Sequence, residues 1–274
     1  MRRRLRRFLR SPLTIFAVIV VLLLLVAAVF APQLATHLPN RQDFRAVLQP
    51  PSATHWLGTD EIGRDIYSRV IFGARISVTV GLLSVGLGGL IGILIGLVSG
   101  FYGGAVDSVL MRLIDVLLAF PGILLAILLA TALGAGLVPV IIAVAAYSVP
   151  TFARVMRGSV LSVRTREFVE AARAAGVRDA TLLVRHIFLN SFAPVLVYAT
   201  LLMGGAILTA AALSFLGVGV APPTPEWGAM ISTARTYMRQ APHVILGPGV
   251  AIFVTVLAFN ILGDALRDAL DPKN

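Results

Sequence analysis

Residues 76–101 read ISVTVGLLSVGLGGLIGILIGLVSGF, a stretch without a single charged side chain. A helix needs about 20 consecutive apolar residues to cross the hydrocarbon core of a bilayer, so this stretch predicts a transmembrane helix. Gly88, Gly92, Gly96 and Gly100 recur at every fourth position and would form one smooth strip on that helix. Because another backbone can approach such a strip closely, we expect the helix to lie inside a bundle, against either another helix of the chain or a second subunit.

Five other stretches are apolar enough to cross a membrane, and together the six predict an all-α, polytopic bundle in one membrane domain. The composition agrees, since 58% of the 274 residues are hydrophobic, 13% are charged and the mean hydropathy is +0.91. That leaves too few polar side chains to cover a protein of this size in water. Pro121 falls in the middle of the third stretch, where a kink is expected because proline lacks a backbone donor. The six predicted spans are residues 13–30, 76–101, 113–133, 137–152, 194–216 and 244–262.

The distribution of Lys and Arg predicts the orientation of the bundle. If the N-terminus is inside, the inner segments hold 16 of the 23 Lys and Arg residues. Positive charges concentrate on the cytoplasmic side of membrane proteins, so we expect both termini in the cytoplasm and a bacterial or archaeal cytoplasmic membrane. The predicted inner segments are the basic N-terminus 1–12, 102–112, the long loop 153–193 and the tail 263–274; the outer ones are 31–75 and 217–243.

Six arginines precede the first span, which could therefore be a cleaved signal peptide. Its 18-residue apolar run is longer than the usual core of a signal peptide. A cleavage site after Ala31 would be followed directly by Pro32, which is unfavourable for cleavage. We expect residues 13–30 to be retained as a membrane anchor.

The segment 153–193 is too long to be a simple connection between spans. Its many helix formers predict two short amphipathic helices, at about 160–175 and 178–189. The turn between them falls at Gly176, since glycine readily adopts the left-handed conformation that ends a helix. Such a pair suits docking onto another protein, and it equally suits a helix lying on lipid headgroups. The residues at helical spacing are Phe168, Ala171, Ala172 and Ala175, then Leu182, Leu183, His186 and Ile187.

Within this segment, Glu170, Ala171, Ala172, Gly176 and Ile187 resemble the EAA loop of ABC importer permeases. In that family the loop is the coupling helix that seats in a groove of the cytoplasmic ATPase. The general family pattern has a proline soon after the isoleucine, where this chain has a leucine. The spacing from the glycine to the isoleucine is one residue longer than in the general form, as in the peptide-type subgroup. The resemblance implies that these five residues couple the chain to an ATPase.

Four further segments resemble the C-type permease subunits of dipeptide and oligopeptide (or nickel) importers. With the EAA loop they occur in the family order and extend over about residues 10–272. The resemblance implies the type I ABC importer fold, a second homologous permease, two cytoplasmic ATPase subunits and an extracytoplasmic solute-binding protein. It implies peptides as the solute, with glutathione or nickel chelates as alternatives, and it identifies no substrate-binding residue. The segments are HWLGTD at 55–60 with GRD at 63–65, AFP at 119–121, SFLG at 214–217, and GD at 263–264 with DP at 271–272.

The residues argue against enzymatic, metal and nucleic-acid chemistry. The chain has no Cys, and its four His residues show no metal-ligand spacing. Asp60, Glu61 and Asp65 lack the alternating ligands of a calcium loop, so we expect them in a polar helix or turn of the outer surface. No phosphate loop or hydrolase motif is present, so ATP hydrolysis and any cofactor would belong to partners. The arginines fall between apolar runs rather than on one soluble face, which is unlike a nucleic-acid-binding surface.

Two other classes of membrane protein fit parts of the pattern. An ion-coupled secondary carrier should place acidic residues deep in its spans. Asp115, near one end of the third span, is the one acid in the predicted cores. Arg112 lies one helical turn away, and we expect the two to form a surface ion pair or to extend toward the headgroups. A non-transporting scaffold would explain the docking loop but not the ordered family segments.

Overall fold

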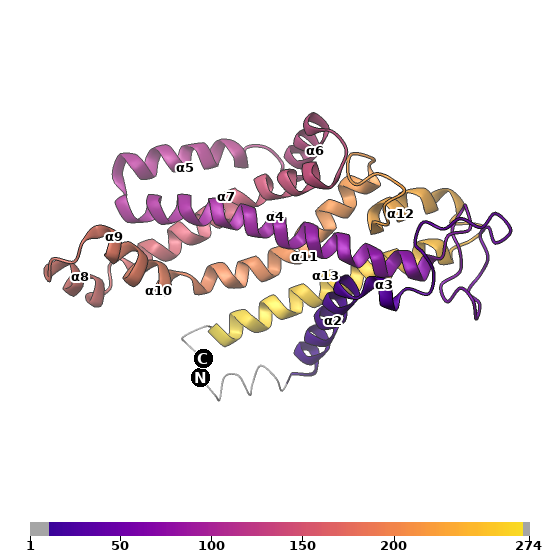
Figure 1. The fold of residues 1–274 in the computed structure, drawn as a ribbon. Coiled ribbons are helices and arrows are strands. Elements are labelled where there is room, and N and C mark those ends of the chain that lie inside the picture. Colours follow the sequence, from indigo (N-terminus) through magenta and orange to yellow (C-terminus); the bar gives the residue numbers. More distant parts are fainter. Residues whose placement is uncertain (1–10, 271–274) are drawn as a thin grey trace.

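The computed structural model describes residues 11–270, which form an elongated bundle of long helices without a strand in this range (Figure 1). Five of the helices are long and apolar enough to cross a membrane, and a bent pair of helices would make a sixth span. The predicted all-α membrane bundle is therefore confirmed. The long helices are α2 (Pro12–Val29), α4 (Ile66–Tyr102), α7 (Leu137–Val163), α11 (Ala193–Phe215) and α13 (His243–Leu270), and the bent pair is α5 (Gly104–Leu118) with α6 (Gly122–Leu133). The six N-terminal arginines and the tail residues after 270 lie outside the described part of the chain.

The third predicted span is broken at the expected place. Helix α5 ends at Leu118, and α6 starts at Gly122 after a bend of 84°. Pro121 directly precedes α6 and has no N–H to continue the preceding helix. The helix begins before the predicted span of about 113–133, because α5 already starts at Gly104, directly after the α4–α5 turn. Residues 104–112, predicted as an inner connection, are therefore helical.

Two helices extend well beyond the apolar runs that predicted them. Helix α4 starts at Ile66, where the Asp65 carboxylate accepts a hydrogen bond from the Ser68 N–H at 2.8 Å and caps the first turn. Helix α7 continues through Pro150 as far as Val163. At 1.5 Å per residue these helices are about 55 and 40 Å long, whereas the hydrocarbon core is about 30 Å thick. Their charged ends therefore project beyond the core.

The glycine strip of α4 faces α7 within the same chain. A Cβ atom built on Gly92 would lie 2.5 Å from Phe152 Cβ, and one built on Gly100 would lie 2.8 Å from Val160 Cβ. No side chain fits at such distances, so these glycines let the two backbones pack directly on each other. Of the two alternatives for this strip, contact with another helix of the same chain is the observed one.

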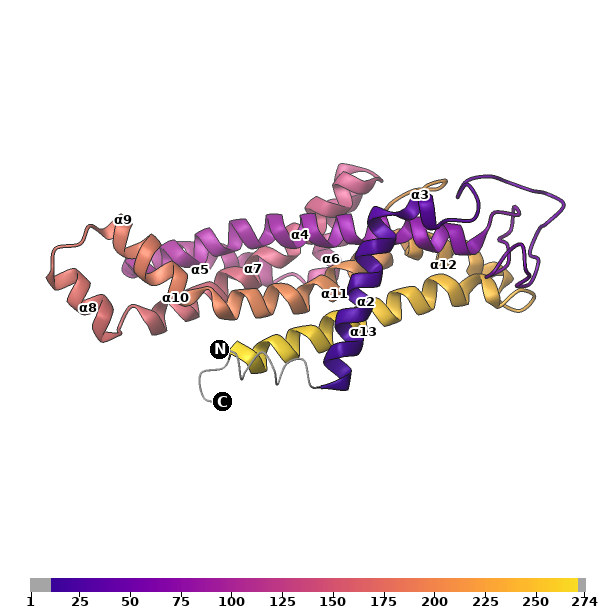
Figure 2. The same ribbon diagram turned by 60° about the horizontal axis from the view of Figure 1, so that its bottom comes forward.

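The bundle has two different ends (Figures 1 and 2). At one end lie the loop 35–65, the short helix α3 (Ala31–Leu34), and α12 (Trp227–Ala234) with the 3-10 turn η2 (Arg235–Tyr237). The opposite end carries α8 (Glu167–Ala174), α9 (Asp179–Thr181), the π-helix η1 (Leu182–Phe188) and α10 (Leu189–Ser191). Helix α2 crosses α13 and α4 obliquely (Figure 2). After the orientation and the role that the sequence predicts for them, we call the first group the outer cap and the second the coupling segment.

Candidate functional site

The coupling segment is a short helix, a glycine turn and a second, irregular helical stretch. The predicted turn at Gly176 is confirmed, since this residue has φ +76° and follows α8. The predicted start of the first helix at about residue 160 is wrong, because residues 160–163 are the last turn of α7. The second helical stretch runs from Asp179 to Ser191, and most of it is a π-helix.

Three buried aliphatic residues attach the coupling segment to the bundle. Val169 of α8 and Leu182 and Ile187 of η1 are fully buried and belong to the main hydrophobic core of the chain. Burying a side chain of this size is worth about 1.5–3 kcal/mol, so the segment is held firmly on the helices behind it. Ile187, predicted to take part in coupling, therefore lies inside the protein rather than on its surface.

The opposite face of α8 is open. Glu170 and Ala171 are exposed, Ala172 is half-buried, and Gly176 has no atom within 4 Å of the position a Cβ would take. Within residues 11–270, Glu170 makes no ion pair. The result is a small-residue surface with an unpaired carboxylate, carried on a firmly anchored helix.

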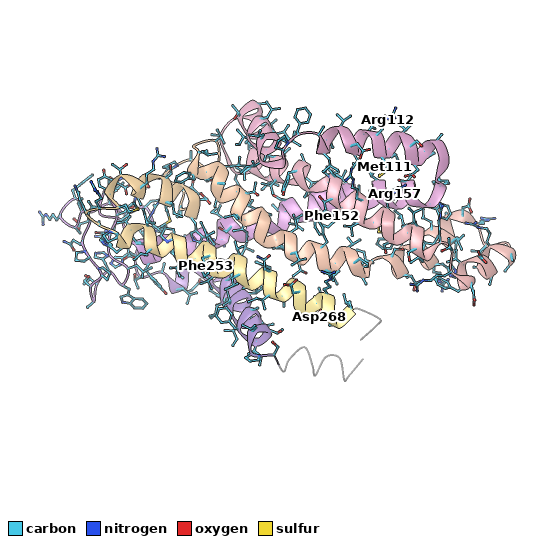
Figure 3. The ribbon with its side chains drawn as sticks, turned by 180° about the vertical axis from the view of Figure 1, so that it is seen from behind. Met111, Arg112, Phe152, Arg157, Phe253 and Asp268 are labelled. Carbon is cyan, nitrogen blue, oxygen red and sulfur yellow. The ribbon has the colours of Figure 1, made fainter. Side chains whose placement is uncertain are left out.

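A bidentate ion pair joins α5 to α7. Arg157 donates from Nε to Asp107 Oδ1 and from Nη2 to Asp107 Oδ2, both at 2.6 Å. A bidentate pair of this kind is among the stronger polar contacts in proteins. Arg164, close to α8, donates to the carbonyl oxygen of Gly100 at 2.8 Å. Figure 3 shows Arg157 together with Met111 and Arg112 on the two neighbouring helices.

The ion-pair partner of Asp115 differs from the predicted one. Its carboxylate lies 2.6 Å from Nη2 of Arg154 on α7, not beside Arg112 of its own helix. Both side chains of the pair are exposed, so the contact adds little to stability.

The outer cap contains a buried ionic cluster. Arg64 donates from Nε to Asp60 at 2.6 Å and from Nη2 to Glu61 at 2.8 Å, and Arg69 Nε lies 3.6 Å from Asp60. Asp60, Arg64 and Arg69 are all buried. The expected turn is present at residues 61–62, and Asp65 caps α4. The expected surface location is wrong for Asp60 and Asp65, because the loop folds back on α4 and buries both.

Helix α12 is fastened to α4 in the same cap. Trp227 is buried and its indole Nε1 donates to the carbonyl oxygen of Val70 at 2.9 Å. Glu226 is also buried and accepts a hydrogen bond from the Ala229 N–H at 2.7 Å. Burial raises the pKa of the Glu226 carboxyl, and hydrogen bonds from the first turn of α12 partly oppose that rise.

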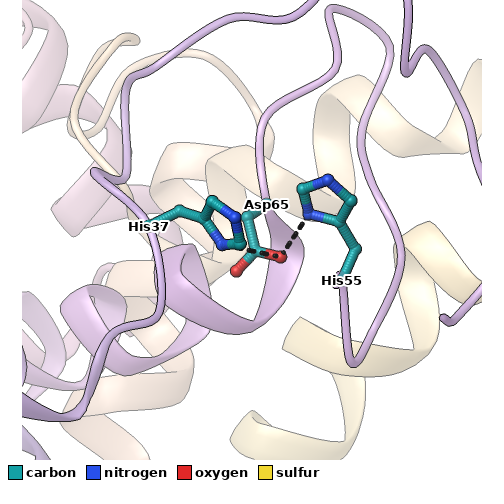
Figure 4. Close-up of side chains that lie close together, drawn as sticks. All are labelled: His37, His55 and Asp65. Atoms are coloured by element: carbon teal, nitrogen blue, oxygen red, sulfur yellow. Dashed lines mark hydrogen bonds and ion pairs between the residues drawn. The ribbon is translucent and has the colours of Figure 1, made fainter. Parts of the chain in front are cut away.

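The fold brings together three residues that the sequence did not connect. His37 and His55 come from two parts of the loop 35–65 and Asp65 from the start of α4, and their side chains converge in the outer cap (Figure 4). The separations along the chain match no local ligand motif. Only the return of the loop onto α4 makes them neighbours.

Comparison with known families identifies the class of protein. Residues 92–274 match the family described as the inner membrane component of binding-protein-dependent transport systems, and residues 1–51 match the N-terminal transmembrane domain of oligopeptide transport permease C. The first match covers more than half of the chain. The chain belongs to this family. The permease is therefore a membrane-spanning subunit of an ABC importer, as its resemblance to peptide-type permeases predicted.

Individual relatives support the same assignment. The permease is 49% identical to the glutathione transport system permease protein GsiD of Pectobacterium atrosepticum over 269 residues, which cover 98% of this chain and 89% of that protein. The protein of the same name from Escherichia coli is 50% identical over the same length. These relatives are transport permeases rather than enzymes, which supports the expectation that ATP is hydrolysed by partner subunits.

Solved structures confirm the type I importer fold. The MetNI methionine ABC transporter in an inward-facing conformation superimposes with a TM-score of 0.61 at 17% identity, covering 74% of the permease and 97% of that chain. An amino acid ABC transporter crystallised with histidines gives a TM-score of 0.55 at 17% identity, covering 72% and 92%. The permease is thus a multi-pass inner membrane protein that works with an ATPase and a binding protein. The secondary-carrier and scaffold alternatives are not supported.

Proposed function

We propose that the permease forms half of the translocation pathway of an importer for small peptides, with glutathione as the first candidate. The observation that carries this proposal is the similarity to glutathione permeases over 98% of the chain. Glutathione is itself a tripeptide, so it falls within the peptide class that the sequence predicted. Dipeptides, longer peptides and nickel chelates are the alternatives for the same machinery.

The assembly would contain a second homologous permease, two cytoplasmic ATPase subunits and an extracytoplasmic solute-binding protein. In this arrangement α8 docks on an ATPase through Glu170, Ala171, Ala172 and the Gly176 turn, while Ile187 anchors the segment from inside. The exposed small residues of α8 allow a close approach, and the buried aliphatic anchors transmit movement to the bundle. Closure of the ATPases on ATP would then rock the helices between two packed states, opening the pathway to the other side.

Uptake by the reconstituted importer tests which solute it transports. The permease, its partner permease, the ATPases and the binding protein are placed in proteoliposomes containing ATP, and labelled glutathione, a dipeptide and a nickel chelate are compared. We expect ATP-dependent accumulation of glutathione that a hydrolysis-deficient ATPase abolishes. If only the dipeptide or only the chelate accumulates, that compound rather than glutathione is the transported solute. Uptake without ATPase subunits would overturn the proposal.

The proposed orientation places the coupling segment and both termini in the cytoplasm and the outer cap outside. The permease has no native cysteine, so single-cysteine variants report their own position without background. We expect Trp56→Cys, at a side chain that is 55% exposed, to react with a membrane-impermeant maleimide in intact spheroplasts. Val184→Cys, at a side chain that is 61% exposed in η1, should react only after the membrane is opened. The reverse pattern would contradict this orientation.

A further inference from the structure

We propose that His37, His55 and Asp65 form a binding site for a divalent transition-metal ion of the Zn²⁺ class in the outer cap. One ligand atom from each residue lies within 4.8 Å of the other two. His55 Nδ1 is 2.9 Å and His37 Nδ1 is 3.8 Å from the same oxygen, Asp65 Oδ1 (Figure 4). Ligands about 2.0–2.1 Å from a tetrahedral ion lie roughly 3.4 Å apart, so the observed distances bracket the spacing that such an ion requires.

The surrounding contacts orient the ligands in the way that metal sites require. Asp65 Oδ2 accepts hydrogen bonds from the Ser68 N–H at 2.8 Å and from Thr36 Oγ1 at 3.4 Å, which leaves Oδ1 facing the two imidazoles. The backbone N–H of His37 donates to Ser68 Oγ at 3.0 Å. These hydrogen bonds to Asp65 Oδ2 and to the His37 backbone hold the ligating residues in place before the ion arrives. Thr36 Oγ1 lies 3.0 Å from His37 Nδ1, and an ion bound to that nitrogen would replace this contact.

The site also has suitable burial and space. The Asp65 side chain is 1% exposed, that of His55 15% and that of His37 31%, so the site is sheltered on one side and reachable on the other. The three residues line a cavity of about 140 Å³ together with Gly63 and two residues of opposite charge, Arg41 and Asp43. This volume accommodates an ion with a bound water.

The chemistry of the ligands selects the class of ion. Two imidazoles with one carboxylate suit Zn²⁺ and neighbouring late transition metals, whereas Ca²⁺ and Mg²⁺ prefer oxygen ligands alone. Three protein ligands leave a fourth position for water or for a donor from a docked molecule. Because the ligands come from the loop 35–65 and from the start of α4, a bound ion would fasten that loop to the helix. The site lies at the opposite end from the coupling segment, so it does not depend on the proposed function.

Zinc binding to the full-length permease tests the site. The protein is purified in lipid nanodiscs with an affinity tag that contains no histidine, stripped with EDTA, and titrated with ZnCl₂ in a calorimeter. We expect saturable binding of one Zn²⁺ that excess Mg²⁺ does not displace. Co²⁺ in place of Zn²⁺ should give the visible absorption bands of a low-symmetry site with nitrogen ligands.

Three variants and one control locate the site. His37→Ala, His55→Ala and Asp65→Asn should each weaken Zn²⁺ binding by about tenfold or more. Even the loss of a residue that only hydrogen-bonds a metal ligand lowers metal affinity by about tenfold or more. Asparagine still caps a helix, so Asp65→Asn should keep the metal-free unfolding temperature of the wild type. His186→Ala, in the coupling segment, should bind as the wild type does. Absence of saturable binding in the wild type, or unchanged affinity in a His37→Ala/His55→Ala double variant, would overturn the proposal.

Discussion

Replacing Gly176 with proline should strongly reduce ATP-dependent uptake while leaving the permease folded and inserted in the membrane. Gly176 has φ +76°, whereas the proline ring holds φ near −65°. The turn after α8 would have to change direction, and the small-residue face would no longer meet the ATPase. A backbone mismatch of this kind costs about 1–3 kcal/mol, and each 1.4 kcal/mol changes an equilibrium about tenfold. We therefore expect uptake in proteoliposomes to fall by about tenfold or more, while the ATPases continue to hydrolyse ATP without solute stimulation.

Matched variants separate this conformational effect from a loss of packing. Asparagine tolerates the left-handed region better than other residues with a side chain, so Gly176→Asn should retain more uptake than Gly176→Val. Gly158→Ala, at an exposed helical glycine with no neighbour within 4 Å, should transport normally. Glu170→Lys reverses an exposed charge that has no ion-pair partner among residues 11–270, so it should impair coupling without lowering stability. Normal uptake by both Gly176→Pro and Glu170→Lys would remove α8 from the coupling role.

Introducing leucine at Gly92 should prevent the permease from accumulating as a folded protein. A Cβ atom alone at this position would lie 2.5 Å from Phe152 Cβ and 2.6 Å from the Val149 carbonyl oxygen. Helix α4 cannot simply move away, because Gly96 and Gly100, one and two turns further along, pack with similar closeness on α7. Overpacking in a core costs about 1–3 kcal/mol even for small additions, and total stabilities are only about 5–15 kcal/mol. The measurement is the yield and unfolding temperature of the detergent-purified protein.

The same helix supplies the control for this prediction. Gly86 has no atom within 4 Å of a built Cβ, and alanine is a better helix former than glycine by about 1 kcal/mol. Gly86→Ala should therefore match or exceed the wild-type unfolding temperature, whereas Gly92→Ala should lower it. An unchanged unfolding temperature for Gly92→Ala would show that α4 and α7 are not held together along the strip.

The features that follow from local properties of the chain could be read before the structure was known. Apolar runs long enough to cross a bilayer located the spans, because the thickness of the hydrocarbon core sets their minimum length. The break at Pro121 and the turn at Gly176 were predicted from the backbone geometry of single residues. The EAA pattern identified the segment that contains α8, although it could not show that Ile187 is buried while Ala171 is exposed.

The sequence by itself determined that this chain is a bundle of membrane-crossing helices with a long helical segment between two of its spans, because hydropathy, proline and glycine act over a few neighbouring residues. The tertiary structure decided where α4 begins and where α7 ends, because a helix can continue past its apolar run when a capping side chain or a packed neighbouring helix stabilises the extra turns. It also decided which charges and imidazoles meet, as in the Arg154–Asp115 pair and the cluster around Asp65. Those contacts join residues far apart along the chain, and only the packing of whole helices and the return of the loop 35–65 bring them together.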